Sequence, residues 1–146
     1  MTFYTIEFNK LTTQQLHSIY KLRNEVFIVE QNCAYQDVDD FDLIAHHIFM
    51  MEKNLMLAYA RILPPNLNYP QPSIGRVLVD VKHRTKNYGK ELMTYCIQQT
   101  QQLYPQQKIV ISAQTYLLKF YANLGFVNSG ENYLEDNIPH IPMILK

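Results

Sequence analysis

The chain opens with apolar and polar positions in alternation, and a helical pattern follows. Residues 3–8 alternate with a period of two, which predicts a β-strand. Thr12 and Gln15 have the spacing of a capping box, so a helix is predicted to begin there. Arg23 falls within the apolar stripe of that helix, and residues 30–42 break the pattern and predict a loop or short helix. The stripe consists of Leu16, Ile19, Tyr20 and Phe27, with Leu22 and Val26 beside it.

The rest of the chain alternates between strand and helix patterns. Apolar runs at residues 45–51 and 55–63, separated by Glu52-Lys53-Asn54, predict a hairpin, and a proline-rich loop follows. Further strands are predicted at 73–81, 108–113, 127–129, near Tyr133 and at 141–145, with helices at 89–102 and 117–124 and Gly125 as a C-cap. Both later helices lie between strands, which is typical of one α/β domain over residues 1–146.

Composition narrows the classes of protein that fit. Apolar residues form 47% of the 146 positions, enough for a full core. Thirteen basic residues balance thirteen acidic ones, which gives no reason to expect nucleic acid or an anionic membrane as a partner. The chain has no signal-peptide pattern and no run near the roughly 18 apolar residues of a membrane helix. Cys33 and Cys96 form no CxxC pair, which favours a reducing compartment, so we predict a cytoplasmic protein.

A strand, a basic turn and a helix form the strongest chemical signal. Helix starts carry free N–H groups and a positive dipole end, so this turn is a candidate anion site. Gly89 allows close approach to a ligand, and Asn87 tolerates positive φ. A Walker A loop is excluded, since Arg84 stands in place of its first glycine and Glu91 in place of its hydroxyl. A solvated basic surface remains the alternative. The cations are Lys82, Arg84, Lys86 and Lys90.

The segment RTKNYGK resembles the R/Q-x-x-G-x-G/A pyrophosphate loop of the GNAT N-acetyltransferases. Arg84 matches the first position and Gly89 the last, while Asn87 replaces the middle glycine. After the strand KIVISA, Gln114 takes the family's Asn-like position, and a Tyr and a Gly-Phe follow as in the family. The segments LRNEVFIVEQNCAYQDVDDFD and EDNIPHIPM resemble the ElaA-type branch, so the resemblance covers nearly the whole chain.

The resemblance implies a fold and a co-substrate. The fold is a mixed, mostly antiparallel sheet of about seven strands, flanked by helices, with a splay between the fourth and fifth strands. The co-substrate is acetyl-CoA. Its pyrophosphate is assigned to the loop, and its pantetheine arm to the backbone of the fourth strand and to Gln114. The expected acetyl-CoA contacts are Val77, Leu78, Val79, Arg84, Thr85, Lys86, Asn87, Tyr88, Gly89, Lys90 and Gln114.

Tyr121 is the expected acid for the leaving thiolate, because the resemblance places it near the sulfur and a phenol is protonated at neutral pH. On pattern alone, Tyr121 would only pack in the core. A backbone N–H near Val79 is the candidate donor for the developing oxyanion. Glu30 and His140 are candidate bases for the attacking amine. Their structural alternatives are a salt bridge between Glu30 and Arg23, and a hydrogen-bonded strand position for His140.

Two polar clusters suggest further sites. The acidic run formed by Asp37, Asp39, Asp40 and Asp42 could attract a cationic amine or be a solvated loop. The pair His46-His47 with Cys33 lacks usual ligand spacing, so we predict no metal site.

The predicted function is transfer of acetyl from acetyl-CoA directly to a primary amine. A non-catalytic acyl-CoA sensor on the same fold and a small nucleotide-binding regulator are the alternatives. The acceptor could be a small amine, an amino acid, a peptide N-terminus or a lysine, and a homodimer is left open.

Overall fold

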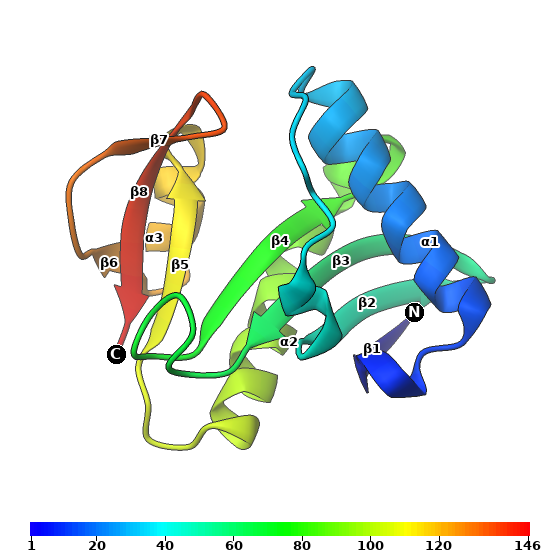
Figure 1. Ribbon diagram of the computed structural model, residues 1–146, viewed down its shortest axis with the longest axis horizontal. Helices are drawn as coiled ribbons and strands as arrows, with labels where there is room; N and C mark the ends of the chain where they lie inside the picture. Colours follow the sequence, from blue (N-terminus) through cyan, green and yellow to red (C-terminus); the bar gives the residue numbers. More distant parts are fainter.

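An eight-stranded sheet forms the centre of the computed structural model, which describes residues 1–146 (Figure 1). The strands lie in the order β1-β2-β3-β4-β5-β8-β6, and β7 pairs with β8. Every pair is antiparallel except β4 with β5. The predicted mixed sheet is confirmed. Its strands are β1 (Thr2–Glu7), β2 (His46–Glu52), β3 (Leu55–Leu63), β4 (Ser73–Val79), β5 (Ile109–Gln114), β6 (Val127–Asn128), β7 (Tyr133–Glu135) and β8 (Ile138–Leu145).

Helix α1 begins at the predicted capping box. Gln15 N–H donates to Thr12 Oγ1 at 3.0 Å, and Thr12 N–H donates to Gln15 Oε1 at 2.9 Å. The helix ends in a π-helical segment, a wider winding that occurs frequently at functional sites. The helices are α1 (Thr13–Arg23), the π-helical η2 (Asn24–Glu30), α2 (Tyr88–Leu103) and α3 (Leu118–Ala122), with short 3-10 turns η1 (Phe8–Lys10), η3 (Asp40–Leu43), η4 (Val81–Lys86) and η5 (Thr115–Leu117).

The predicted hairpin joins β2 to β3. Lys53 and Asn54 have φ values of 51° and 65°, and left-handed backbone at both central residues is the requirement of a type I′ turn. The left-handed Gly125, with a φ of 101°, closes the last helix as predicted. That helix is shorter than the predicted 117–124, because residues 115–117 wind as a 3-10 turn. Strand β4 ends two residues before the predicted 81.

The helices cover opposite faces of the sheet, α1 on one and α2 on the other (Figure 1). Period-two alternation sends successive side chains of a strand to opposite faces. Ala58 therefore packs with Leu92 of α2, while its neighbour Tyr59 packs with Ile19 of α1. The two hydrophobic clusters contain 18 and 8 buried residues. The sheet thus separates the molecule into an α2 side and an α1 side.

Strands β4 and β5 part after a single pair, which confirms the predicted splay. Ser73 is paired with Val110, and Val110 N–H donates to the carbonyl of Pro72 at 3.0 Å. Beyond that point the two strands diverge (Figure 1). A β-bulge in β4 adds to the bend, since the register with β3 shifts there and Arg76 has a φ of 52°.

Candidate active site

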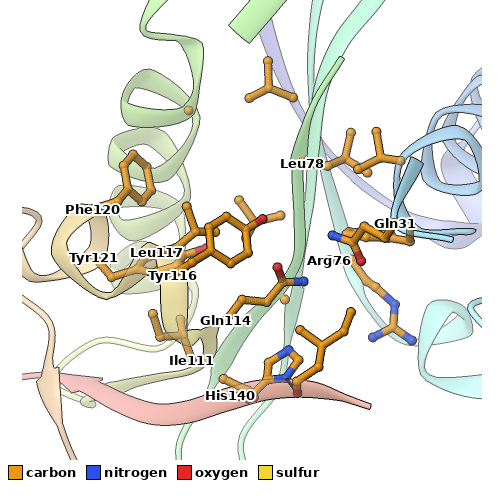
Figure 2. Close-up of a pocket in the computed structure, with 18 of the residues that line it drawn as sticks. Gln31, Arg76, Leu78, Ile111, Gln114, Tyr116, Leu117, Phe120, Tyr121 and His140 are labelled. Atoms are coloured by element: carbon orange, nitrogen blue, oxygen red, sulfur yellow. Dashed lines mark hydrogen bonds between the residues drawn. The ribbon is translucent and has the colours of Figure 1, made fainter. Parts of the chain in front are cut away.

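A cleft of about 620 Å³ lies where β4 and β5 part. Figure 2 shows Tyr121 and Phe120 on one side and Leu78 and Arg76 on the other. Gln114 lies between the two sides, with His140 beside it. The cleft therefore crosses the sheet and is reached from both of its faces.

The basic turn leads into α2 at one end of the cleft. Asn87 has the left-handed backbone that the sequence predicted, with a φ of 63°. Gly89 lies inside the first turn of α2 with no positive φ, so Asn87 and not Gly89 makes the reversal. Of the predicted loop contacts, the structure brings four to the cleft: Arg84, Asn87, Gly89 and Lys90.

Three other loop residues predicted to contact the co-substrate do not line the cleft. The side chain of Tyr88 is buried in the core on the α2 side, so only its backbone is available to a ligand. Thr85 and Lys86 are exposed outside the cleft. The winding of the 3-10 turn and of the first helical turn decides which side chains face the cleft. The positions of the basic residues along the sequence do not indicate which ones these are.

Strand β4 presents free backbone groups to the cleft. Asp80 N–H donates to the carbonyl of Leu57 at 2.8 Å, so the backbone groups of Asp80 face β3. Because antiparallel pairs alternate, those of Leu78 also face β3, and those of Val77 and Val79 face the cleft. Val77 thus offers both main-chain groups and Val79 its N–H, while Leu78 offers its side chain. The carbonyl of Val79 already accepts a hydrogen bond from Arg84 Nε at 3.2 Å.

Tyr121 lies in α3 with its ring packed among aromatic neighbours. Its ring meets Phe120 and Phe126 edge-on, with centroids 5.1 and 6.0 Å apart. Burial raises the pKa of Tyr121 well above its ordinary value, so the hydroxyl keeps its proton. This residue lines the cleft, and its hydroxyl makes no hydrogen bond to the protein. The ring therefore packs, as the pattern alone predicted, while the residue also borders the cleft.

His140 lies on β8, opposite Gln114 of β5. Its Nδ1 is 2.7 Å from the carbonyl of Ile138, so the proton of a neutral imidazole is held there and Nε2 carries the lone pair. Nε2 makes no hydrogen bond; the nearest acid is Glu135, whose Oε2 is 3.4 Å away. Tyr133 stacks on the ring at a centroid distance of 6.0 Å. This strand position is hydrogen-bonded, as the structural alternative predicted, and still leaves one basic nitrogen free.

Glu30 does not pair with Arg23. Its carboxylate instead forms two hydrogen bonds of 2.5 Å with the guanidinium of Arg84, across the cleft. This hydrogen bonding raises the pKa of Arg84. The candidate base Glu30 and Arg84, the first residue of the basic loop, are therefore paired with each other.

Three residues of the acidic run belong to an ion-pair network, in which Asp37 and Asp42 are buried and Asp39 is half-buried. Asp42 is 1% exposed, and its Oδ1 lies 2.8 Å from both Arg23 and Arg61. Burial raises the pKa of a carboxyl group, but the hydrogen bonds and charges of these arginines hold the pKa of Asp42 below its ordinary value. Asp37 is also buried, at 2.8 Å from Arg23. The solvated-loop interpretation is wrong for these residues, and only Asp40 is exposed.

Arg76 links this network to the cleft. It was not among the site residues predicted from the sequence. Its Nε lies 2.8 Å from Asp37 Oδ1, and its Nη2 donates to the Asp37 carbonyl at 3.0 Å. The guanidinium also lies over the ring of Tyr35. Figure 2 shows the head group of Arg76 turned away from Gln114 and Tyr121. An arginine within the apolar strand SIGRVLV was the signal that could have identified it.

In the pair His46-His47, both ring nitrogens of His47 are occupied by other groups of the protein. His47 is buried between the hydroxyl of Tyr59, 2.6 Å away, and the carbonyl of Asp42, 2.8 Å away. Burial lowers the pKa of His47 and keeps it neutral. No three His, Cys, Asp or Glu side chains are grouped to hold a metal ion.

No helix is long and apolar enough to cross a bilayer.

Known proteins resemble this chain over nearly its whole length. The Acetyltransferase (GNAT) domain family matches residues 9–146. A UPF0039 protein from Synechocystis is 41% identical over 95% of this chain and 91% of its own length. Protein ElaA from Escherichia coli is 38% identical over 92% and 90%.

Two crystal structures extend the resemblance to the fold. An acyl-CoA N-acyltransferase from Pseudomonas aeruginosa superposes with a TM-score of 0.94 at 37% identity, with 99% of each chain covered. Escherichia coli ElaA gives a TM-score of 0.93 at 35% identity, also with 99% of each chain covered. The fold described above therefore also occurs in an acyl-CoA N-acyltransferase, and the chain belongs to the GNAT acetyltransferase family, with ElaA and the UPF0039 proteins among its relatives.

Proposed function

We propose that this protein transfers the acetyl group of acetyl-CoA directly to a primary amine, in a complex that holds both substrates. The observation that carries the proposal is the cleft between β4 and β5, which connects a basic helix start on one face to a free imidazole nitrogen on the other. We further propose that residues 1–146 form one acetyltransferase domain. Cys33 and Cys96 are both free thiols, which supports a cytoplasmic location.

The residues at the start of α2 fit the pyrophosphate of a CoA thioester. Arg84 and Lys90 supply positive charge beside the cleft, and the first backbone N–H groups of α2 lack helical partners. The main-chain groups of Val77 would hydrogen-bond the amide-containing arm, with Gln114 at the far side. Bound acetyl-CoA supplies an acyl group activated as a thioester. The N–H of Val79 would stabilise negative charge on the carbonyl oxygen during transfer.

His140 is the better candidate base, because Glu30 is held by Arg84 while His140 Nε2 is free. An ammonium that becomes an amide loses two protons. His140 would take one and release it to solvent, and the other ends on the thiol. Tyr121 would deliver that proton as the C–S bond breaks and the C–N bond forms, and would regain its own from the amine through solvent.

The loop assignment is tested at Gly89 by thermal unfolding with and without acetyl-CoA. A bound ligand raises the melting temperature. Gly89→Asp should abolish the rise, because its carboxylate would repel the pyrophosphate at the helix start. Gly89→Ala is the matched control: its Cβ would meet Phe120 at an ordinary 3.5 Å, so most of the rise should remain. A full rise in the Asp variant would contradict the assignment.

Tyr121→Phe should lower turnover by a factor of about 10²–10⁴ while leaving the affinity for acetyl-CoA nearly unchanged. The phenyl ring keeps the aromatic packing and removes only the hydroxyl that borders the cleft. Release of the free thiol of CoA under saturating substrates measures the effect. Normal turnover, where chemistry limits the rate, would leave Tyr121 with a packing role alone.

Glu30→Gln should tighten acetyl-CoA binding, by up to about fivefold, because a neutral amide releases the Arg84 guanidinium to a phosphate. Arg84→Ala should weaken binding. Titration calorimetry with CoA compares both variants with the parent protein. Weaker binding by the Gln variant would mean that the Glu30–Arg84 pair orders the loop for the ligand and does not compete with it.

A non-catalytic CoA-binding protein is separated from the enzyme by the same assays. A sensor would give a thermal shift with acetyl-CoA and no CoA release with any amine. An enzyme gives both.

A further inference from the structure

Two acids at one end of the cleft are paired with no lysine or arginine, although Glu135 lies 3.4 Å from the imidazole of His140. Glu135 ends β7 and Asp136 follows it in the turn to β8, and both line the cleft. Neither carboxylate pairs with a lysine or arginine. The lysine and arginine cations that line the same cleft are held by another group or lie at the start of α2.

Those cations are Arg76, Arg84 and Lys90. Arg76 is held by Asp37, and its head group points away from the cleft centre (Figure 2). Arg84 and Lys90 belong to the basic loop at the start of α2. The end of the cleft on the β7–β8 side is therefore negative, and it offers no free cation to a substrate carboxylate.

His140 connects these acids to the reacting centre. Its side chain is 8% exposed, and its Nε2, which has no hydrogen bond, lies 3.4 Å from Glu135 Oε2. An amine that gives its proton to Nε2 must approach this same point. A substrate with a second positive charge would then place that charge within reach of Glu135 or Asp136.

The turn that carries Asp136 is contacted by a second loop. Cys33 Sγ donates to the carbonyl of Asp136 at 3.2 Å, so the loop after η2 meets the β7–β8 turn there. Phe27 and Ile138 line this end and provide apolar surface. An aliphatic chain can therefore pack along this apolar surface.

From these contacts we infer that the acceptor is a short aliphatic diamine or polyamine. This inference rests on the proposed acetyl transfer. One nitrogen is acetylated beside His140, the methylenes lie along the apolar wall, and a distal ammonium is bound by Glu135 and Asp136.

Three amines with four carbon atoms test the inference: the fourth carbon bears an ammonium in putrescine, is a methyl in butylamine and is a carboxylate in γ-aminobutyrate. Calorimetric binding of each to the CoA-saturated protein is measured first, and CoA release with acetyl-CoA second. Putrescine should bind roughly tenfold or more tightly than butylamine, and γ-aminobutyrate should bind weakest. The double substitution Glu135→Gln and Asp136→Asn should remove most of this preference. Asp40→Asn, an exposed acid outside the cleft, is the matched control and should keep it.

Equal binding of putrescine and butylamine would overturn the inference, as would a preference that survives in the double variant. Better turnover of a lysine peptide than of putrescine would also overturn it. Failure of the proposed function is distinguishable, because it would appear as the absence of any acetyl-CoA thermal shift or of any CoA release, whichever amine binds.

Discussion

Replacing Asp42 with asparagine should lower the free energy of unfolding by about 3–5 kcal/mol. The carboxylate lies 2.8 Å from both Arg23 and Arg61, and all three side chains are buried. A neutral amide would leave two guanidinium groups sharing too few acids in a region that water does not reach. Because natural domains are stable by only about 5–15 kcal/mol, this single change should remove a large part of the stability.

Urea unfolding followed by circular dichroism measures this loss. Asp40→Asn changes the same charge only two residues away, at an exposed position, and should change the free energy of unfolding by no more than about 0.5 kcal/mol. Equal losses in the two variants would show that net charge, and not the buried pairing, accounts for the effect.

Replacing His140 with alanine should reduce turnover by a factor of about 10²–10⁴ and leave the acetyl-CoA thermal shift in place. The imidazole is the proposed acceptor of the amine proton, and it lies on the opposite face of the cleft from the basic loop. Turnover by the variant should rise with pH over the range in which solution supplies more unprotonated amine. CoA release measured across pH gives both the size and the pH dependence of the loss.

A purely structural role for His140 predicts different results for the alanine variant. The variant would then lose melting temperature and cofactor affinity together, with the pH profile unchanged in shape. Glu30→Gln is the companion variant, because a loss as large as that of the alanine variant at His140 would return the role of base to Glu30.

Local signals in the sequence predicted the fold well. The Thr12–Gln15 capping box and the turn at Lys53-Asn54 depend on neighbours within a few residues, and both formed as expected. The left-handed Asn87 was predicted for the same reason, since a side chain's tolerance of positive φ is a property of that residue alone.

The electrostatics of the site could not be predicted in this way. Glu30 and Arg84 are 54 residues apart, and Arg61 and Asp42 are 19 residues apart. Whether an acidic run is solvated or neutralised depends on which arginines the folded sheet brings beside it. A charged residue inside an apolar pattern, as Arg23 is in the first helix and Arg76 in β4, was the local sign of an ion-pair partner.

The parting of β4 from β5 also matters for how the molecule avoids sticking to copies of itself. Unpaired strand edges are templates for intermolecular pairing, and proteins generally shorten, charge or cover them. Here the free main-chain groups of Val77 and Val79 lie inside a cleft and not at the rim of the sheet. The same geometry that leaves the sheet incomplete therefore protects its open edges from aggregation.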